Sequence, residues 1–126
     1  MHEAAVADAN RRYYEAFEAA DLDAMSALWE RSDRAVCTHP GWATLRGWSQ
    51  VGASFFALFQ QPVHTQFLLT RQHTVVAGDV AWLSLDENLL GEQGGVTVAT
   101  LNIFVRSSGA WAMVCHHASP VHASVC

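Results

Sequence analysis

Residues 96–119 read VTVATLNIFVRSSGAWAMVCHHAS, and this stretch contains the clearest indication of fold class in the chain. Residues 96–106 are mostly β-branched or apolar, and residues 110–119 are again largely apolar. Between them, Ser107-Ser108-Gly109 is typical of a tight turn. The pattern predicts two long strands joined as a hairpin.

The same pattern extends upstream of this hairpin. Residues 64–76 are rich in Thr, Val, Phe and Leu, and Gly78-Asp79 supplies a turn into residues 80–90. Residues 91–95 contain three glycines and predict a further turn. The second half of the chain is therefore expected to form a meander of four long strands.

The first half has the spacing of helices. Residues 3–20 place apolar or aromatic side chains three and four positions apart, with charged side chains mostly opposite, which indicates an amphipathic helix. Asp21 is expected to be the N-cap of a second, short helix. A short strand at residues 35–38 runs into a Pro-Gly turn, and a third helix starts near Gly47 or Trp48 and is ended by Pro62.

Three helices followed by a strand meander predict an α+β fold rather than an alternating α/β one. Residues 1–126 are expected to form a single domain, because the chain shows no repeat, linker or low-complexity stretch and is long enough for a substantial core. One face of the sheet should be buried under the helices.

Composition excludes several classes of protein. The chain is 51% hydrophobic and 15% charged, which excludes intrinsic disorder. Its net charge of -5, with seven Arg and no Lys, argues against a nucleic-acid partner. No apolar run is long enough to span a membrane, and the first residues do not resemble a secretory signal peptide. The seven His and five Trp are the unusual feature.

The three cysteines favour a reducing compartment. Cys37, Cys115 and Cys126 are widely spaced, odd in number and free of any CxxC pair, so neither a disulfide framework nor a structural zinc site is indicated. A cytoplasmic location is expected.

The informative residues are polar side chains where packing predicts apolar ones. They lie on the first helix, after the first short strand and in three of the long strands: Tyr13, His39, Asp86, Glu87, Asn102, His116 and His117. Each also has a structural interpretation, such as a core tyrosine, a histidine that fixes a turn, or carboxylates solvated at a rim. Because side chains alternate along a strand, one of His116 and His117 should face the helices and the other should face away.

The chain lacks the sequence motifs that are typical of several kinds of enzyme and metal site. The histidines show no HxH, HxxxH or HExxH spacing, so no metal site is expected. The chain has no GxSxG nucleophile motif and no Gly-rich phosphate loop.

Four segments together resemble the SnoaL-like branch of the superfamily named after nuclear transport factor two. They are AADLDAMSALW (19–29), VCTHPGW with the following LRGW (36–48), TLNIFVR (100–106) and GAWAMVCHHASP (109–120). The resemblance covers nearly the whole chain, and the HPGW turn resembles a bacterial group within the branch. The superfamily also contains ketosteroid isomerases, polyketide cyclases and the association domain of calmodulin-dependent kinase.

The resemblance implies a fold and a set of site residues. The fold is a cone-shaped roll, in which three helices pack in a strongly bent antiparallel sheet around an apolar pocket. In the isomerases a tyrosine on the first helix and an acid on the penultimate strand donate to the substrate oxyanion, and an Asp before a Pro is the base. Tyr13, Asn102 and His39 hold the matching places here. Because both carboxylates are replaced, ketosteroid isomerisation itself is not implied, and Asp86 is the remaining interior-strand carboxylate.

We therefore expect a pocket that binds a small apolar, aromatic or polycyclic molecule. Its expected lining, apart from Tyr13, His39 and Asn102, is Trp29, Trp42, Phe55, Phe59, Asp86 and one of His116 and His117. The expected activity is isomerase- or cyclase-like proton transfer with His39 as base, Tyr13 and Asn102 as donors, and no cofactor.

Two alternatives stay open: a ligand-binding module without turnover, and an oligomerisation module like the kinase association domain. Members of the family commonly form dimers through the outer sheet face, so a homodimer is expected. If Tyr13, His39 and Asn102 converge on one cavity, the enzyme and binding hypotheses are favoured. If they make separate backbone contacts, the oligomerisation hypothesis is favoured.

Overall fold

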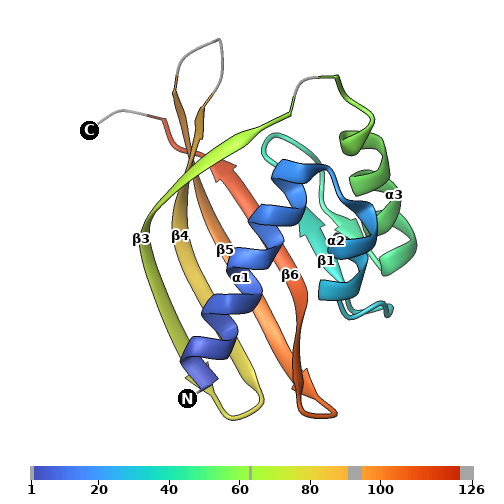
Figure 1. The fold of residues 1–126 in the computed structure, drawn as a ribbon, viewed down its shortest axis with the longest axis vertical. Helices are drawn as coiled ribbons and strands as arrows, with labels where there is room; N and C mark the ends of the chain where they lie inside the picture. Colours follow the sequence, from blue (N-terminus) through green and yellow to red (C-terminus); the bar gives the residue numbers. More distant parts are fainter. Residues whose placement is uncertain (1, 63, 91–94, 123–126) are drawn as a thin grey trace.

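The computed structural model describes residues 2–62, 64–90 and 95–122. Within these residues, three helices pack against one side of a six-stranded sheet (Figure 1). The helices are α1 (His2–Ala19), α2 (Leu22–Leu28) and α3 (Trp48–Phe59). The strands are β1 (Val36–Thr38), β2 (Leu45–Arg46), β3 (Gln66–Ala77), β4 (Val80–Leu90), β5 (Val96–Ser107) and β6 (Ala110–Pro120). The predicted α+β class is confirmed.

The sheet has the strand order β2-β1-β6-β5-β4-β3 and curls around α1 without closing (Figure 1). The four long strands pair as the expected antiparallel meander. The pair of β1 and β6 is parallel, which the expectation of an antiparallel sheet did not include. The two-residue strand β2 was not predicted from the sequence, because it is too short to show a periodic pattern.

The local signals for two turns and one cap are confirmed. Ser108 and Gly109 both have positive φ, at 55° and 81°, as a two-residue hairpin turn requires. Gly78, with φ 63°, begins the turn between β3 and β4. Asp21 accepts a hydrogen bond from the backbone N–H of Ala24 at 3.0 Å and so caps α2. The turn expected at 91–95 falls mainly on 91–94, outside the described residues.

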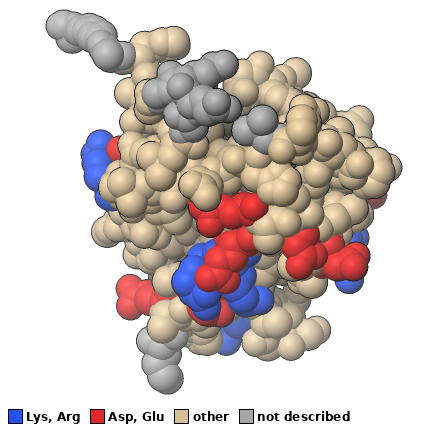
Figure 2. All heavy atoms as spheres, turned by 45° about the horizontal axis from the view of Figure 1, so that its top comes forward, with Lys and Arg blue, Asp and Glu red and all other residues tan. Residues whose placement is uncertain are grey.

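The core lies between α1 and the concave face of the sheet. Val6, Ala9, Tyr13 and Ala16 recur at helical spacing on α1 and are all buried. The opposite side of α1 carries ion pairs of Arg11 and Arg12 with neighbouring acids. Figure 2 shows positive and negative side chains side by side on this face rather than in separate patches.

Two β-bulges bend the long strands. One interrupts the pairing of β3 with β4 between Thr70 and His73, where Arg71 has a positive φ of 56°. The other lies in β6, where Ile103 pairs with Cys115 but Phe104 pairs with Met113, so Val114 is an extra residue. Bulges increase local bending and re-aim the side chains that follow.

No helix among the described residues is long and apolar enough to cross a lipid bilayer.

Candidate functional site

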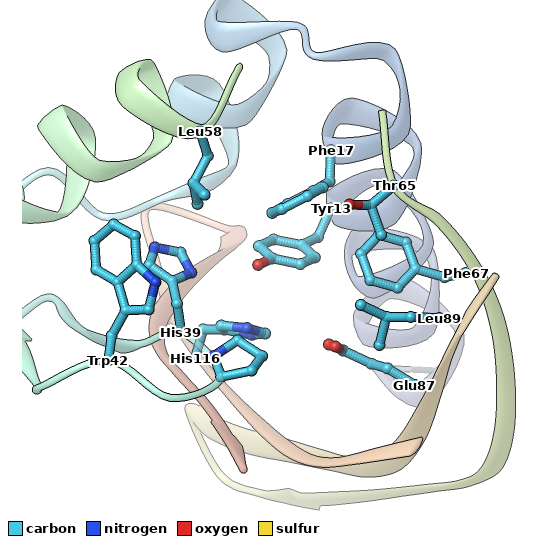
Figure 3. A pocket seen from close by; sticks show the side chains of 11 residues that line it. Tyr13, Phe17, His39, Trp42, Leu58, Thr65, Phe67, Glu87, Leu89 and His116 are labelled. Carbon is cyan, nitrogen blue, oxygen red and sulfur yellow. The ribbon is translucent and has the colours of Figure 1, made fainter. Parts of the chain in front are cut away.

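Four buried polar side chains from separate parts of the fold meet at one pocket (Figure 3). Tyr13 comes from α1, His39 from the turn after β1, Glu87 from β4 and His116 from β6. Each is no more than 3% exposed, yet each lines a cavity of about 180 Å³. Figure 3 shows the Tyr13 hydroxyl and the Glu87 carboxylate both directed into the space in front of the two imidazole rings.

The rest of the pocket wall is mostly apolar. It is formed by Phe17, Pro40, Trp42, Leu58, Thr65, Phe67 and Leu89. Trp42 is 42% exposed, so it lies toward the mouth, whereas the polar groups lie at the floor. A pocket with apolar walls and a few converging polar groups has the usual anatomy of a small-molecule site.

The HPGW segment forms a β-turn that positions His39 and Trp42. The backbone N–H of Trp42 donates to the carbonyl of His39 at 2.8 Å, and Gly41 has a φ of 82°. Pro at the second position and a positive-φ glycine at the third are the requirements of a type II turn. The turn brings the rings of His39 and Trp42 edge to face at 4.9 Å, on the same wall of the pocket.

A hydrogen bond determines the tautomer of His39. The Ser54 hydroxyl donates to the carbonyl of Val51 at 2.6 Å, and His39 Nε2 lies 2.8 Å from the same hydroxyl oxygen. Since the hydroxyl proton is already used, Nε2 must donate, which leaves the lone pair on Nδ1, 3.8 Å from the Cys37 sulfur. Burial lowers the pKa of His39 to about 4, so the ring is uncharged at neutral pH.

His116 is the inward histidine, and the bulge in β6 makes it so. Met113 faces the core, and simple alternation from it would turn position 117 inward; the extra residue Val114 turns His116 inward and leaves His117 exposed. The ring of His116 stacks on that of Tyr13, with centroids 4.9 Å apart. Burial, with smaller contributions from neighbouring His39 and His117, lowers the pKa of His116 to about 3.

Asn102 lies behind His116 rather than in the pocket lining. Its Oδ1 accepts a hydrogen bond from His116 Nδ1 at 2.6 Å, so the His116 lone pair is on Nε2. Its Nδ2 donates to Asn10 Oδ1 at 2.8 Å and to the Tyr14 hydroxyl at 3.2 Å. Asn102 therefore holds the orientation of a pocket histidine and does not reach the cavity itself.

The same network continues to Glu87. The Tyr14 hydroxyl donates to Glu87 Oε2 at 2.5 Å. Burial raises the pKa of Glu87 to about 6, although the Tyr14 hydrogen bond opposes the rise. The chain of contacts from His116 through Asn102 and Tyr14 to Glu87 thus joins two walls of the pocket within the buried interior.

Tyr13 presents an unused donor to the cavity. Its hydroxyl makes no hydrogen bond to any residue that the structure describes, and its side chain lines the pocket. Burial, together with nearby Cys37, Tyr14 and Glu87, raises its pKa well above the ordinary value. The hydroxyl therefore stays protonated and can donate to a ligand oxygen.

Three apolar residues expected in the pocket lie elsewhere in the structure. Trp29 is 3% exposed and packs against Trp48 and Phe55, because a bridge from Trp29 to Met113 draws it under the sheet. Phe55 is fully buried behind the ring of His39. Phe59 contacts Phe17 and lines a smaller neighbouring cavity.

The carboxylate of the pocket is Glu87, not Asp86. Asp86 lies on the other face of β4, where Arg71 pairs with it at 3.4 Å. The alternation of β4 places the odd-numbered residues Leu83, Leu85 and Glu87 on the buried face. The expectation that Glu87 sits at a solvated rim is therefore wrong. The alternation of Leu83 and Leu85, continued by one step, would have placed Glu87 on the buried face.

Of the three residues expected to converge, Tyr13 and His39 line one cavity and Asn102 supports a third lining residue, His116. Within the described residues, no group of three or more His, Cys, Asp or Glu side chains is arranged to hold a metal ion. The pocket floor contains two uncharged imidazoles, a protonated phenol, and a carboxyl group whose pKa is raised to about 6.

Comparisons with known proteins place these features in context. The model of the SnoaL-like domain matches residues 6–123. A Streptomyces avermitilis protein of the NTF2-like family, provisionally named a dehydratase, is 35% identical, with a TM-score of 0.88 and 97% of each chain covered. A Thiobacillus denitrificans protein, provisionally named a calcium/calmodulin-dependent protein kinase type II association domain, is 32% identical, with a TM-score of 0.82 and coverage of 90% of this chain and 93% of that one.

Among curated proteins, F-box protein SKIP8 of Arabidopsis thaliana is 29% identical over 115 residues. The match covers 91% of this chain but 49% of that protein, so the chain spans about half the length of this relative.

Proposed function

Because the chain belongs to the SnoaL-like family of the NTF2-like superfamily, we propose that its pocket performs cofactor-independent acid–base catalysis on a small apolar carbonyl compound. The observation that supports this most is the convergence of Tyr13, His39, Glu87 and His116 on one pocket floor. Perturbed titratable groups that share a cleft are a frequent mark of active sites.

His39 acts as the base. At neutral pH its ring is uncharged and Nδ1 holds a lone pair, so Nδ1 can accept a proton from the carbon next to the substrate carbonyl. The electrons of the broken C–H bond form an enolate. The Tyr13 hydroxyl donates a hydrogen bond to the enolate oxygen and stabilises its charge.

The proton that His39 has taken is used again at the other end of the reaction. In an isomerisation, this proton returns to a different carbon of the enolate. In a dehydration, the enolate expels a β-hydroxyl group, which takes the proton from His39 and leaves as water. Glu87, whose pKa of about 6 leaves it ionised at neutral pH, favours the positively charged form of His39 between the two steps. The name given to the Streptomyces relative favours the second course.

The test is hydrogen exchange at a simple ketone. Cyclohexanone is incubated with the protein in D₂O, and loss of the signal from its α-hydrogens is followed by NMR. The wild type should accelerate exchange over buffer. His39→Gln should reduce the enzymatic rate by about 100-fold or more, and Tyr13→Phe by a similar factor.

The matched control is His117→Gln, which removes an exposed imidazole next to the site and should leave the rate unchanged. Circular dichroism verifies that each variant is folded. A folded His39→Gln protein that exchanges at the wild-type rate would rule out His39 as the base. A wild-type rate equal to that of buffer would contradict catalysis.

A second candidate function is association without turnover. The observation that favours it is the apolar outer face of the sheet, where Trp82 and Leu101 are 36% and 37% exposed on the adjacent strands β4 and β5. The Thiobacillus relative carries the name of an association domain. In this function two copies of the chain pair through the outer face as a homodimer.

Sedimentation velocity tests the homodimer. The wild type should sediment as a dimer, and Trp82→Glu combined with Leu101→Glu should give a monomer. Phe56→Glu is the matched control, because Phe56 is 55% exposed but lies on α3, away from the sheet. A monomeric wild type at about 100 μM, well above the dissociation constant of a specific dimer, would contradict this second function.

A further inference from the structure

The dimensions and charge of the pocket restrict what it can bind. We propose that it takes an uncharged compound with a single six-membered ring and one oxygen substituent, and that it excludes two-ring and anionic compounds. This inference rests on the proposed function, because it takes the same pocket as the substrate site. It narrows the substrate class, for which the sequence allowed polycyclic molecules.

Volume limits the number of rings. The cavity holds about 180 Å³. An engineered protein cavity of about 150 Å³ accommodates one benzene molecule. The present cavity is therefore matched to one ring and a small substituent. A second fused ring would exceed this volume, so it would have to displace a half-buried wall residue such as Leu58 or Phe67, or extend into solvent beside Trp42.

The walls favour a flat ring. Figure 3 shows Trp42 on one side of the cavity and Phe67 on the other, with Phe17 between them at the helix side. The rings of Phe17 and Phe67 pack edge to face at 5.3 Å, which fixes their orientation. A planar ligand ring fits between such surfaces through stacked and edge contacts.

Charge excludes anions. Among the described lining residues none is Arg, and the chain has no Lys. The described arginines that form ion pairs do so on the surface, as Arg11 does with Glu15 and Arg106 does with Asp79. His39 and His116 are uncharged at neutral pH, so the one formal charge in the lining is that of Glu87. An anion would enter a buried site without a partner and beside a carboxylate, which is strongly unfavourable.

The floor determines where the oxygen of the ligand lies. The Tyr13 hydroxyl is a donor with no partner among the described residues, and the lone pairs of the two imidazoles and the Glu87 carboxylate are acceptors. A carbonyl oxygen can accept from Tyr13, and a hydroxyl can also donate to an acceptor beside it. An uncharged ring with one such group satisfies the floor.

Isothermal titration calorimetry at pH 8 with two matched ligand pairs tests the inference. Phenol and 2-naphthol differ by one ring, and benzamide and benzoate differ in charge at nearly equal size. Phenol and benzamide should bind, whereas 2-naphthol and benzoate should each bind about tenfold more weakly or worse than their partners. Binding of phenol should also change the fluorescence of the wild type but not that of Trp42→Phe.

Two variants should reverse the two exclusions separately. Leu58→Ala should enlarge the cavity and strengthen binding of 2-naphthol by about tenfold. Glu87→Gln should strengthen binding of benzoate relative to that of benzamide by a similar factor. Asp86→Asn is the control for the second variant, since it removes a carboxylate from the opposite face of the same strand.

Each exclusion can be overturned. Binding of 2-naphthol as tight as that of phenol would refute the size limit, and binding of benzoate as tight as that of benzamide would refute the charge limit. If neither phenol nor benzamide binds, the inference as a whole is wrong. Because binding is measured without turnover, ligand selectivity with no ketone exchange would remove the proposed catalysis and leave this inference intact.

Discussion

Replacing Glu87 by glutamine should stabilise the protein at alkaline pH. The folded state raises the pKa of this carboxyl from 4.5 to about 6, chiefly through burial. The folded protein therefore binds this proton more tightly than the unfolded chain does. The contribution of Glu87 to stability is full below pH 4.5 and is lost as the pH rises to 6.

The expected gain follows from the size of this change. A pKa moved from 4.5 to about 6 corresponds to about 2 kcal/mol between the ionised and neutral forms. Glutamine does not ionise, and its side-chain oxygen can still accept the hydrogen bond that Tyr14 donates. At pH 8, Glu87→Gln should raise the free energy of unfolding by about 2 kcal/mol, or roughly 5–10 °C in Tm. At pH 4.5 the gain should nearly vanish.

Urea denaturation at pH 4.5 and pH 8, followed by circular dichroism, measures both quantities. Asp86→Asn makes the same chemical change one residue away, on the other face of β4, and should alter stability by less than about 0.5 kcal/mol at either pH. If Glu87→Gln is no more stable than the wild type at pH 8, then an ionised carboxylate is not costly at this position, and the reasoning fails.

Three further predictions concern the groups around the pocket. Asn102→Leu leaves the buried His116 Nδ1 without an acceptor, so urea denaturation should show a free energy of unfolding lower by about 2–4 kcal/mol. A loss below about 1 kcal/mol would mean that the hydrogen bond between Asn102 and His116 does not stabilise the fold. Phe55→Ala creates a cavity behind His39 and should cost about 3–5 kcal/mol in the same assay, whereas a change within 1 kcal/mol would mean that the site collapses. His39→Gln concerns acid stability: the folded-state pKa of about 4 lies below 6.5, so His39 contributes stability that is full above pH 6.5 and lost as the pH falls to 4. Between pH 6.5 and pH 4, the free energy of unfolding measured in urea should fall by about 3 kcal/mol less in the variant than in the wild type. If the two proteins lose the same free energy over this interval, burial does not lower the pKa of His39.

Much of the fold could be predicted from local signals. The helical spacing on α1, the Asp21 cap and the hairpin turn at Ser108-Gly109 each depend on a few neighbouring residues, and each is confirmed. The parallel pairing of β1 with β6 depends on tertiary contacts, and no local pattern in the sequence encodes it.

The site was predicted less completely, because its geometry depends on strand register. Glu87 follows the alternation of β4 and could have been placed inward from Leu83 and Leu85. The choice between His116 and His117 could not be made in that way, because a bulge leaves no periodic trace in an apolar strand. Trp29 has the spacing of the apolar face of α2, but that spacing does not distinguish a core residue from a pocket wall.

The extra residue in β6 also makes the pocket sensitive to the register of this strand. If Val114 paired with Ile103 instead of forming the bulge, every later residue of β6 would shift by one position, so His117 would turn toward Tyr13 and His116 would move to the solvent side. Two adjacent histidines provide a spare imidazole against such a shift, but the hydrogen bond with Asn102 would have to be rebuilt. Relatives that lack the bulge can therefore have the same residues in this strand and a different arrangement of groups in the pocket. A sequence alignment does not distinguish the two arrangements, because the bulge changes the pairing and leaves the residues unchanged.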